Sequence, residues 1–272
     1  MRITVDHRTT YRFSVPQGRV TQLLRLTPSG TDGQAVASWG IHVDCDARMR
    51  HGRDGFGNRT TMLYVDGPIH GIEIEVSGEV LTNGSDGVLH GSVEPLPPAV
   101  FLRSTPLTEA GGALAGFAAD AVASVSDAVE RMHVLNVAFH KHFTLDRGRP
   151  VSGRSAAEAF ESKSATLRDF AQMFTAGARG LGVPARYVSG YSSACFIGDT
   201  PPAPHGWAEV FIEGLGWVAF DPCTGLSADD AYVRVAVALD SAGAAPVAGS
   251  RLGEGHEELD VDLHVGRDSA QD

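Results

Sequence analysis

The chain has 272 residues, 43% of them hydrophobic and 20% charged, which is the composition of a folded globular protein with a sizeable core. Its 22 basic and 33 acidic residues give a net charge of −11, and the basic residues are scattered along the chain. This excludes the basic stripe of a nucleic-acid-binding protein. No apolar run approaches the roughly 20 residues of a membrane span, so we expect neither nucleic acid nor membrane as a partner.

The cysteines, the histidines and the first residues of the chain bear on disulfides, metal sites and location. The cysteines Cys45, Cys195 and Cys223 are far apart and odd in number, which fits neither a disulfide framework nor a zinc site. His140 and His142 lack an obvious third ligand, so we expect exposed histidines, no metal and no cofactor. The first residues show no secretory signal, and the expected location is the cytoplasm.

The first 95 residues have the pattern of antiparallel β-structure. Apolar and polar residues alternate in short runs at 3–13, 39–43 and 72–80. A dense turn signal at 54–58, Asp-Gly-Phe-Gly-Asn, precedes the apolar run 62–65 and predicts a hairpin. Several short strands separated by turns indicate an antiparallel β-sandwich-like module over residues 1–95, with a proline-rich linker at 94–98.

Residues 96–272 combine helical and strand patterns. The stretch 110–129 is alanine-rich, and the clearest helix spans about residues 166–180, where Thr166 and Asp169 have the spacing of a capping box. Short strands are expected at 186–188, 208–212, 217–220 and 259–265. The predicted class is α+β, with a second domain over residues 96–272 that includes a C-terminal strand.

A hairpin in this second part suggests a catalytic pair. His205 precedes one predicted strand, Asp221 ends the next, and the turn at 213–216 brings both to the same end of the sheet. A carboxylate beside an imidazole fixes its tautomer and forms the base and orienting acid of a catalytic triad. From the hairpin alone, a structural histidine and an aspartate that closes a turn remain the favoured alternative.

A nucleophile would be well placed at the start of the helix 166–180, where backbone amides and the helix dipole stabilise a thiolate. The chain there reads Thr166, Leu167, Arg168 and Asp169 and has no cysteine. We expect Thr166 to cap the helix. Arg168 and Asp169 are expected to be exposed charges, with Asp169 favourable to the helix dipole.

Three ordered blocks resemble the bacterial transglutaminase-like family: the helix and strand of 167–191, His-Gly-Trp-Ala-Glu at 205–209, and Gly-Trp-Val-Ala-Phe-Asp-Pro at 216–222. Residues 6–58 resemble the β-rich module that precedes the core in that family. The resemblance implies a papain-like α+β core with a Cys-His-Asp triad, which acts on glutamine amides or peptide bonds through a thioester.

Carried over to this chain, the resemblance makes His205 the base and Asp221 the orienting acid, and it places the nucleophile position on Leu167. An isobutyl group has no lone pair and cannot attack a carbonyl. A second departure lies at 238–241, where Ala-Leu-Asp-Ser replaces the family's Gly-Arg-Asp-Tyr-like segment. Both departures fall in regions that the family ties to its active cleft, and they favour relaxed selection on catalysis.

Three functional hypotheses follow. The first is a pseudoenzyme that has lost its catalytic cysteine and binds a peptide or protein partner in the cleft. The second is a thiol hydrolase or acyltransferase, a cysteine protease or amide transferase, that uses the displaced nucleophile Cys195, ten residues before His205. A buried, inert Cys195 is the favoured alternative to that role, and Cys223 is interpreted as a packing or turn residue. The third is a structural or assembly role of the N-terminal module.

Overall fold

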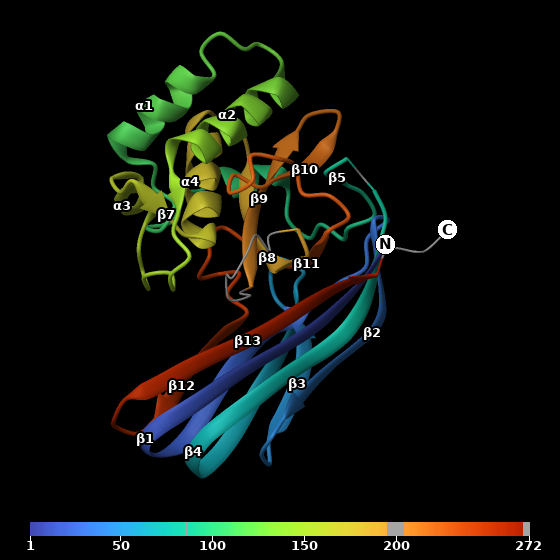
Figure 1. Ribbon diagram of the computed structural model, residues 1–272, viewed down its shortest axis with the longest axis vertical. Helices are drawn as coiled ribbons and strands as arrows, with labels where there is room; N and C mark the ends of the chain where they lie inside the picture. The colour runs from blue at the N-terminus through green and yellow to red at the C-terminus, as the bar shows by residue number, and fades with distance from the viewer. Residues whose placement is uncertain (85, 195–203, 269–272) are drawn as a thin grey trace.

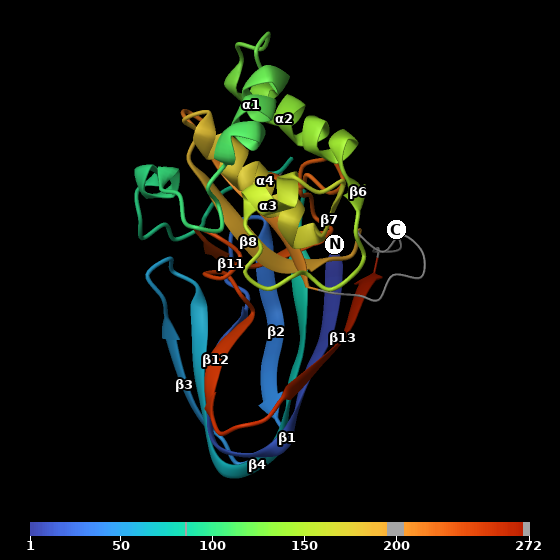
Figure 2. The same cartoon turned by 90° about the vertical axis from the view of Figure 1, so that its left-hand side faces the viewer.

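The computed structural model describes residues 1–84, 86–194 and 204–268 and confirms an α+β protein (Figures 1 and 2). Its strands are β1 (Arg2–Thr27), β2 (Gln34–Val43), β3 (Arg48–Arg53), β4 (Arg59–Thr82), β5 (Val88–Leu89), β6 (Thr144–Leu145), β7 (Ser164–Ala165), β8 (Ala185–Ser192), β9 (His205–Ile212), β10 (Gly216–Phe220), β11 (Tyr232–Ala238), β12 (Val247–Leu252) and β13 (Glu257–Asp268). Its helices are the 3-10 helix η1 (Pro98–Leu102), α1 (Gly111–Ala121), α2 (Ala128–His142), α3 (Ala156–Phe160) and α4 (Leu167–Gly180). Within these described ranges, no helix is long and apolar enough to cross a membrane.

The six-stranded sheet is built on two long strands, β1 and β4, which pair along most of their length. The first half of β1 also pairs with β13 and its second half with β12, whereas β4 pairs first with β3 and then with β2. Register shifts near Arg12 and Gln17 mark the bend between the halves. One sheet is thereby folded toward a sandwich-like shape around its own apolar core (Figure 2).

The C-terminal strands correct the expected division at residue 95. Both β12 and β13 pair with β1, so the expected C-terminal strand completes the first sheet and does not belong to the second domain. Conversely, β5 lies before residue 95 but pairs with β10, at the edge of the second sheet. The two sheets therefore exchange segments: β12 and β13 belong to the first sheet, and β5 belongs to the second. No single linker separates the residues of the two sheets.

The second sheet has five antiparallel strands in the order β11-β8-β9-β10-β5. Helix α4 packs along β8 and β9, and the Phe174 ring stacks on Phe220 of β10 with their centroids 5.6 Å apart. The helices α1, α2 and α3 all contact α4, which buries most of its side chains. The alanine-rich stretch 110–129 is not one helix, because α1 ends at Ala121 and Asp127 caps a new helix, α2.

Two buried amide side chains join the sheets at the edge strand β11. The Gln34 side chain accepts a hydrogen bond from the Arg234 N–H at 2.8 Å and donates to the Arg234 carbonyl at 2.9 Å. Asn58 makes the same pair of bonds with Val237, at 2.8 and 2.7 Å. Each amide satisfies one donor and one acceptor on the strand edge, as a neighbouring strand would.

His7 lies in the same interface between the sheets. Its Nδ1 is 3.0 Å from the Tyr191 hydroxyl of β8, and its Nε2 is 3.1 Å from the Thr9 hydroxyl. Burial lowers the pKa of His7 to about 4, so the ring is neutral at neutral pH. The apolar part of this interface consists of side chains from both sheets, namely Ile3, Val5, Val80, Tyr191, Val233, Val235, Ala236 and Leu263.

We predict that protonation of His7 destabilises the fold in mild acid. The unfolded chain takes up this proton below about pH 6.5, whereas the lowered pKa of His7 lets the folded state resist it down to about pH 4. This contribution to stability is full above pH 6.5 and falls by up to about 3 kcal/mol as the pH drops to 4. Urea unfolding should show a shallower pH dependence for His7→Gln than for wild type.

The exposed His70→Gln serves as the matched control and should keep the wild-type dependence. Equal pH dependence for wild type and His7→Gln would contradict this role of His7.

Candidate functional site

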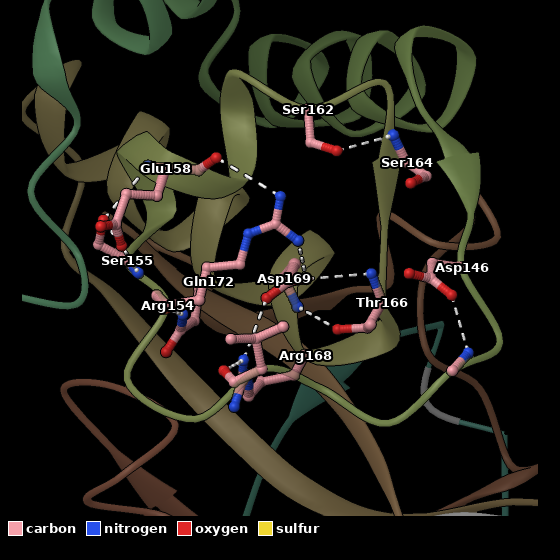
Figure 3. A network of polar contacts seen from close by, with 12 residues as sticks. Asp146, Arg154, Ser155, Glu158, Ser162, Ser164, Thr166, Arg168, Asp169 and Gln172 are labelled. Carbon is pink, nitrogen blue, oxygen red and sulfur yellow. Dashed lines mark hydrogen bonds and ion pairs between the residues drawn. The ribbon is translucent and has the colours of Figure 1, made fainter.

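Helix α4 begins where the sequence predicts, and Leu167 is its first residue. The Thr166 hydroxyl accepts a hydrogen bond from the Asp169 N–H at 3.3 Å, and the Asp169 carboxylate accepts one from the Thr166 N–H at 3.2 Å (Figure 3). This reciprocal pair confirms the predicted capping box. Leu167 is half-buried and belongs to none of the hydrophobic clusters that the described residues form.

Asp169 is not the exposed charge that the sequence suggests. Its side chain has no exposed surface and lies 3.2 Å from Arg154 Nη1 and 3.4 Å from Arg168 Nη2. Arg168 also donates to the Val151 carbonyl, and the Gln172 amide donates to the Arg154 carbonyl at 3.2 Å. The loop between β6 and α3 is thereby tied to the start of α4 (Figure 3).

His205 and Asp221 meet as the hairpin predicts. His205 begins β9, Asp221 follows β10, and His205 Nε2 lies 2.7 Å from Asp221 Oδ2. Their side chains are only 2% and 0% exposed. Asp221 accepts two more hydrogen bonds, from the Tyr232 hydroxyl at 2.7 Å and from the Cys223 N–H at 2.9 Å. The structure brings the two residues together, and their catalytic role stays a prediction.

The partners of Asp221 decide its charge. Burial raises the pKa of Asp221, but His205, Tyr232 and the Cys223 N–H outweigh burial and keep that pKa below its usual range. A carboxylate at this point holds the proton of the neutral imidazole on Nε2, so that Nδ1 is the proton-accepting nitrogen. Sequence reasoning misses Tyr232, which lies 11 residues beyond Asp221 on a strand absent from the expected set.

Tyr187 connects the start of α4 with the start of β9. A side chain at Gly206 would collide with the Tyr187 hydroxyl, so the ring lies directly against the backbone beside His205. Burial raises the pKa of Tyr187. Its ring also packs with Ala171 of α4, so that α4 and the start of β9 both contact this tyrosine.

The second departure from the family pattern also borders α4. Ala238 and Ala244 pack with Ala171 of α4 and with Tyr187. The Ser241 hydroxyl donates to the side-chain oxygen of a buried glutamine of α4. The stretch 238–244 therefore lies against the same helix whose first residue is Leu167.

A second buried charge cluster supports the sheet. Glu209 of β9 accepts hydrogen bonds from Arg186 Nε at 2.6 Å and Arg234 Nε at 2.7 Å. Arg186 has no exposed surface, binds both oxygens of Glu94, and lies 3.8 Å from the centre of the Trp217 ring. Burial raises the pKa of Glu209, but Arg234 and Arg186 overcome this and hold that pKa at about 2. The ion pairs of Glu209 with Arg186 and Arg234 therefore link β9, the strand that begins with His205, to β8 and β11.

Cys195, the proposed substitute nucleophile, lies outside the described residues. Cys223 is half-buried in the turn after Asp221 and packs against the main core, as a packing residue would. His140 and His142 are exposed at the end of α2, and His140 Nδ1 is 2.7 Å from the Cys223 carbonyl. In the part of the chain that the structure describes, no group of three or more His, Cys, Asp or Glu side chains could hold a metal ion.

We predict that Tyr232→Phe raises the pKa of Asp221. The substitution deletes one of the donors that stabilise the carboxylate, and a hydrogen bond to a charged group contributes about 1.5–3 kcal/mol. The pKa should therefore rise by about one or more. Carbon-13 NMR titration of the Asp221 carboxyl measures this directly, and Tyr64→Phe on β4 is the control that should change nothing. An unaltered titration in Tyr232→Phe would contradict the assignment.

Two family models match this chain. Residues 3–81 match the bacterial transglutaminase-like N-terminal region, and residues 115–222 match the transglutaminase-like superfamily. Together the matches cover more than half of the chain, and the second contains Leu167, His205 and Asp221.

Two relatives and one solved structure resemble this chain over part or nearly all of its length. An uncharacterized protein of Mycobacterium tuberculosis (strain H37Rv) is 25% identical over 287 residues, which span 91% of this chain and 87% of that protein. An uncharacterized protein of Mycobacterium leprae is 30% identical over 117 residues, or 42% of this chain and 41% of that protein. The crystal structure of a candidate cysteine protease from Cytophaga hutchinsonii has the same fold, with a TM-score of 0.79 at 18% identity over 98% of this chain and 90% of that one. The chain combines a bacterial transglutaminase-like N-terminal region with a core of the transglutaminase-like superfamily, and it has a cysteine-protease-like fold.

Proposed function

We propose that this chain is a non-catalytic member of its family, which binds an extended peptide segment of a partner protein where α4, β9 and Asp221 converge. The observations that carry the proposal are Leu167 at the first position of α4 and the buried His205–Asp221 pair, with Tyr187 in contact with both α4 and the start of β9. The base and its orienting acid are retained, and the group on which they would act is replaced.

The chemistry of the fold explains why this replacement matters. In thioester chemistry, the cysteine thiol gives its proton to the histidine, and the sulfur then bonds to the carbonyl carbon while the amine leaves. A leucine side chain has neither a proton to transfer nor a lone pair to donate. Loss of a triad nucleophile lowers turnover by roughly 10⁶. The half-buried isobutyl group of Leu167 offers an apolar contact to a bound side chain instead.

Two other readings stay open to test. A thiol hydrolase or acyltransferase would use Cys195, and the intact His205–Asp221 pair is the observation that favours this alternative. A purely structural role would rest on the six-stranded sheet. The cytoplasmic location expected from the sequence also stays a prediction.

We predict that Leu167→Cys creates an activated thiol. A cysteine at the first position of α4 gains stabilisation of its thiolate from the helix N-terminus and from His205. Its alkylation by iodoacetamide at pH 6 should be at least tenfold faster than that of Leu215→Cys, an exposed leucine in the β9–β10 turn. Mass spectrometry after timed quenching measures both rates.

Adding His205→Ala to Leu167→Cys should return the rate to that of the control cysteine. Ordinary reactivity of Leu167→Cys would contradict the placement of the nucleophile position. Wild-type hydrolysis of peptide amides that His205→Ala abolishes would contradict the non-catalytic assignment itself.

A further inference from the structure

Two arginines stand opposite each other where β3 and β4 meet their connecting turn. Arg53 and Arg59 are register partners in the antiparallel ladder, so their side chains lie on the same face of the sheet. Both residues are exposed. Like charges directly opposite each other repel and destabilise the strand pair. An anion held between them would remove that repulsion.

The carboxylates nearest to this pair are engaged elsewhere. Asp54 binds Arg25 Nε at 2.9 Å on one oxygen and accepts backbone N–H groups of its own turn on the other. Both oxygens of Glu94 are taken by Arg186. Among the ion pairs of the described residues, none joins Arg53 or Arg59 to a carboxylate. The pair is thus a local excess of positive charge in a chain of net charge −11.

The surface around the pair is hollowed on both sides. Arg53 and Arg59 line two adjoining hollows of about 510 and 530 Å³, volumes in the range of small-molecule sites. Trp39 and Phe56 line the first hollow, which lies between the two sheets and also touches β11. The Arg53 guanidinium is already held in place, because its Nη1 donates to the Gly57 carbonyl at 2.7 Å.

The remaining charges of these hollows cancel. Arg234 also lines the first hollow, but Glu209 binds it at 2.7 Å, and Glu94 is neutralised by Arg186. The second hollow adds His51, whose Nδ1 is 2.9 Å from the Thr61 hydroxyl. Two positive charges therefore face the space between the hollows, and the ligand that matches them carries two negative charges.

We propose that Arg53 and Arg59 bind the phosphate group of a small phosphate monoester, whose organic part lies in the hollow lined by Trp39 and Phe56. A phosphate monoester carries close to two negative charges at neutral pH, and its oxygens match the planar donor fork of arginine. Thr27 and Thr60 also line the second hollow and carry hydroxyl groups suited to donate to a phosphate. A ligand in this position contacts both sheets.

Isothermal titration calorimetry tests this site with inorganic phosphate and phenyl phosphate as probes. Phenyl phosphate should bind the wild type more tightly than phosphate does, because its ring can pack in the Trp39 hollow. Arg53→Gln and Arg59→Gln should each weaken phenyl phosphate binding by roughly 10- to 100-fold. The matched control is Arg50→Gln, since Arg50 is exposed on β3 but lies an odd number of residues from Arg53 and faces the other side.

Equal weakening by Arg50→Gln, or the absence of saturable binding to the wild type, would overturn the proposal. Equal affinities for phosphate and phenyl phosphate would contradict binding of the organic part in the hollow lined by Trp39 and Phe56. Thermal unfolding in phosphate-free buffer supplies the folding control. Arg59→Gln removes one of two repelling charges and should be at least as stable as wild type. A less stable Arg59→Gln would make Arg59 a structural residue and would also overturn the proposal.

Discussion

A carboxylate without exposed surface must find its hydrogen-bond donors inside the protein, and Asp221 draws them from three parts of the chain. His205 comes from β9, the Cys223 N–H from the turn that follows Asp221, and Tyr232 from β11. The same strand β11 carries Arg234 to the buried Glu209. It also presents its free edge to the buried amides that join the two sheets. The order of the site and the docking of the six-stranded sheet therefore depend on one strand and its buried partners.

Under the proposed function, this constraint explains why His205 and Asp221 would persist without a nucleophile. Removing Asp221 would take away the buried acceptor of three hydrogen bonds, from His205, Tyr232 and the Cys223 N–H, and such a loss is strongly destabilising. Leu167 is only half-buried, at a helix position already capped by Thr166, where an exchange of side chains disturbs little packing. Retention of His205 and Asp221 is thus what stability alone requires, and it does not by itself imply catalysis.

Local sequence patterns predict helix α4 and the hairpin of β9 and β10, which carry Leu167, His205 and Asp221. The start of α4 follows from Thr166 and Asp169, whose side chains satisfy the backbone of their own turn. The tight turn between β9 and β10 brings His205 and Asp221 to the same end of the sheet. What could not be predicted depends on distant partners. Asp169 is buried because a loop supplies Arg154, and the strand edge of β11 is satisfied by an amide 200 residues away.

The same reason accounts for the domain boundary. The alternation at 259–265 predicts a strand, but its partner is β1, at the opposite end of the chain. Periodicity identifies strands and their buried faces, whereas the choice of partner depends on the packing of the whole molecule. Tyr232 illustrates the consequence for the site, because its role becomes visible only when β11 is placed beside β8.

The most direct test of the account is the rate of thiol alkylation of the native wild-type protein against pH, mapped to each cysteine by mass spectrometry. A non-catalytic protein has no activated thiol, so Cys45, Cys195 and Cys223 should all react slowly at pH 6, as expected for a free cysteine with a pKa of about 8.5. Fast labelling of Cys195 at pH 6 that His205→Ala abolishes would contradict the account, because it would identify a displaced nucleophile working with the retained pair.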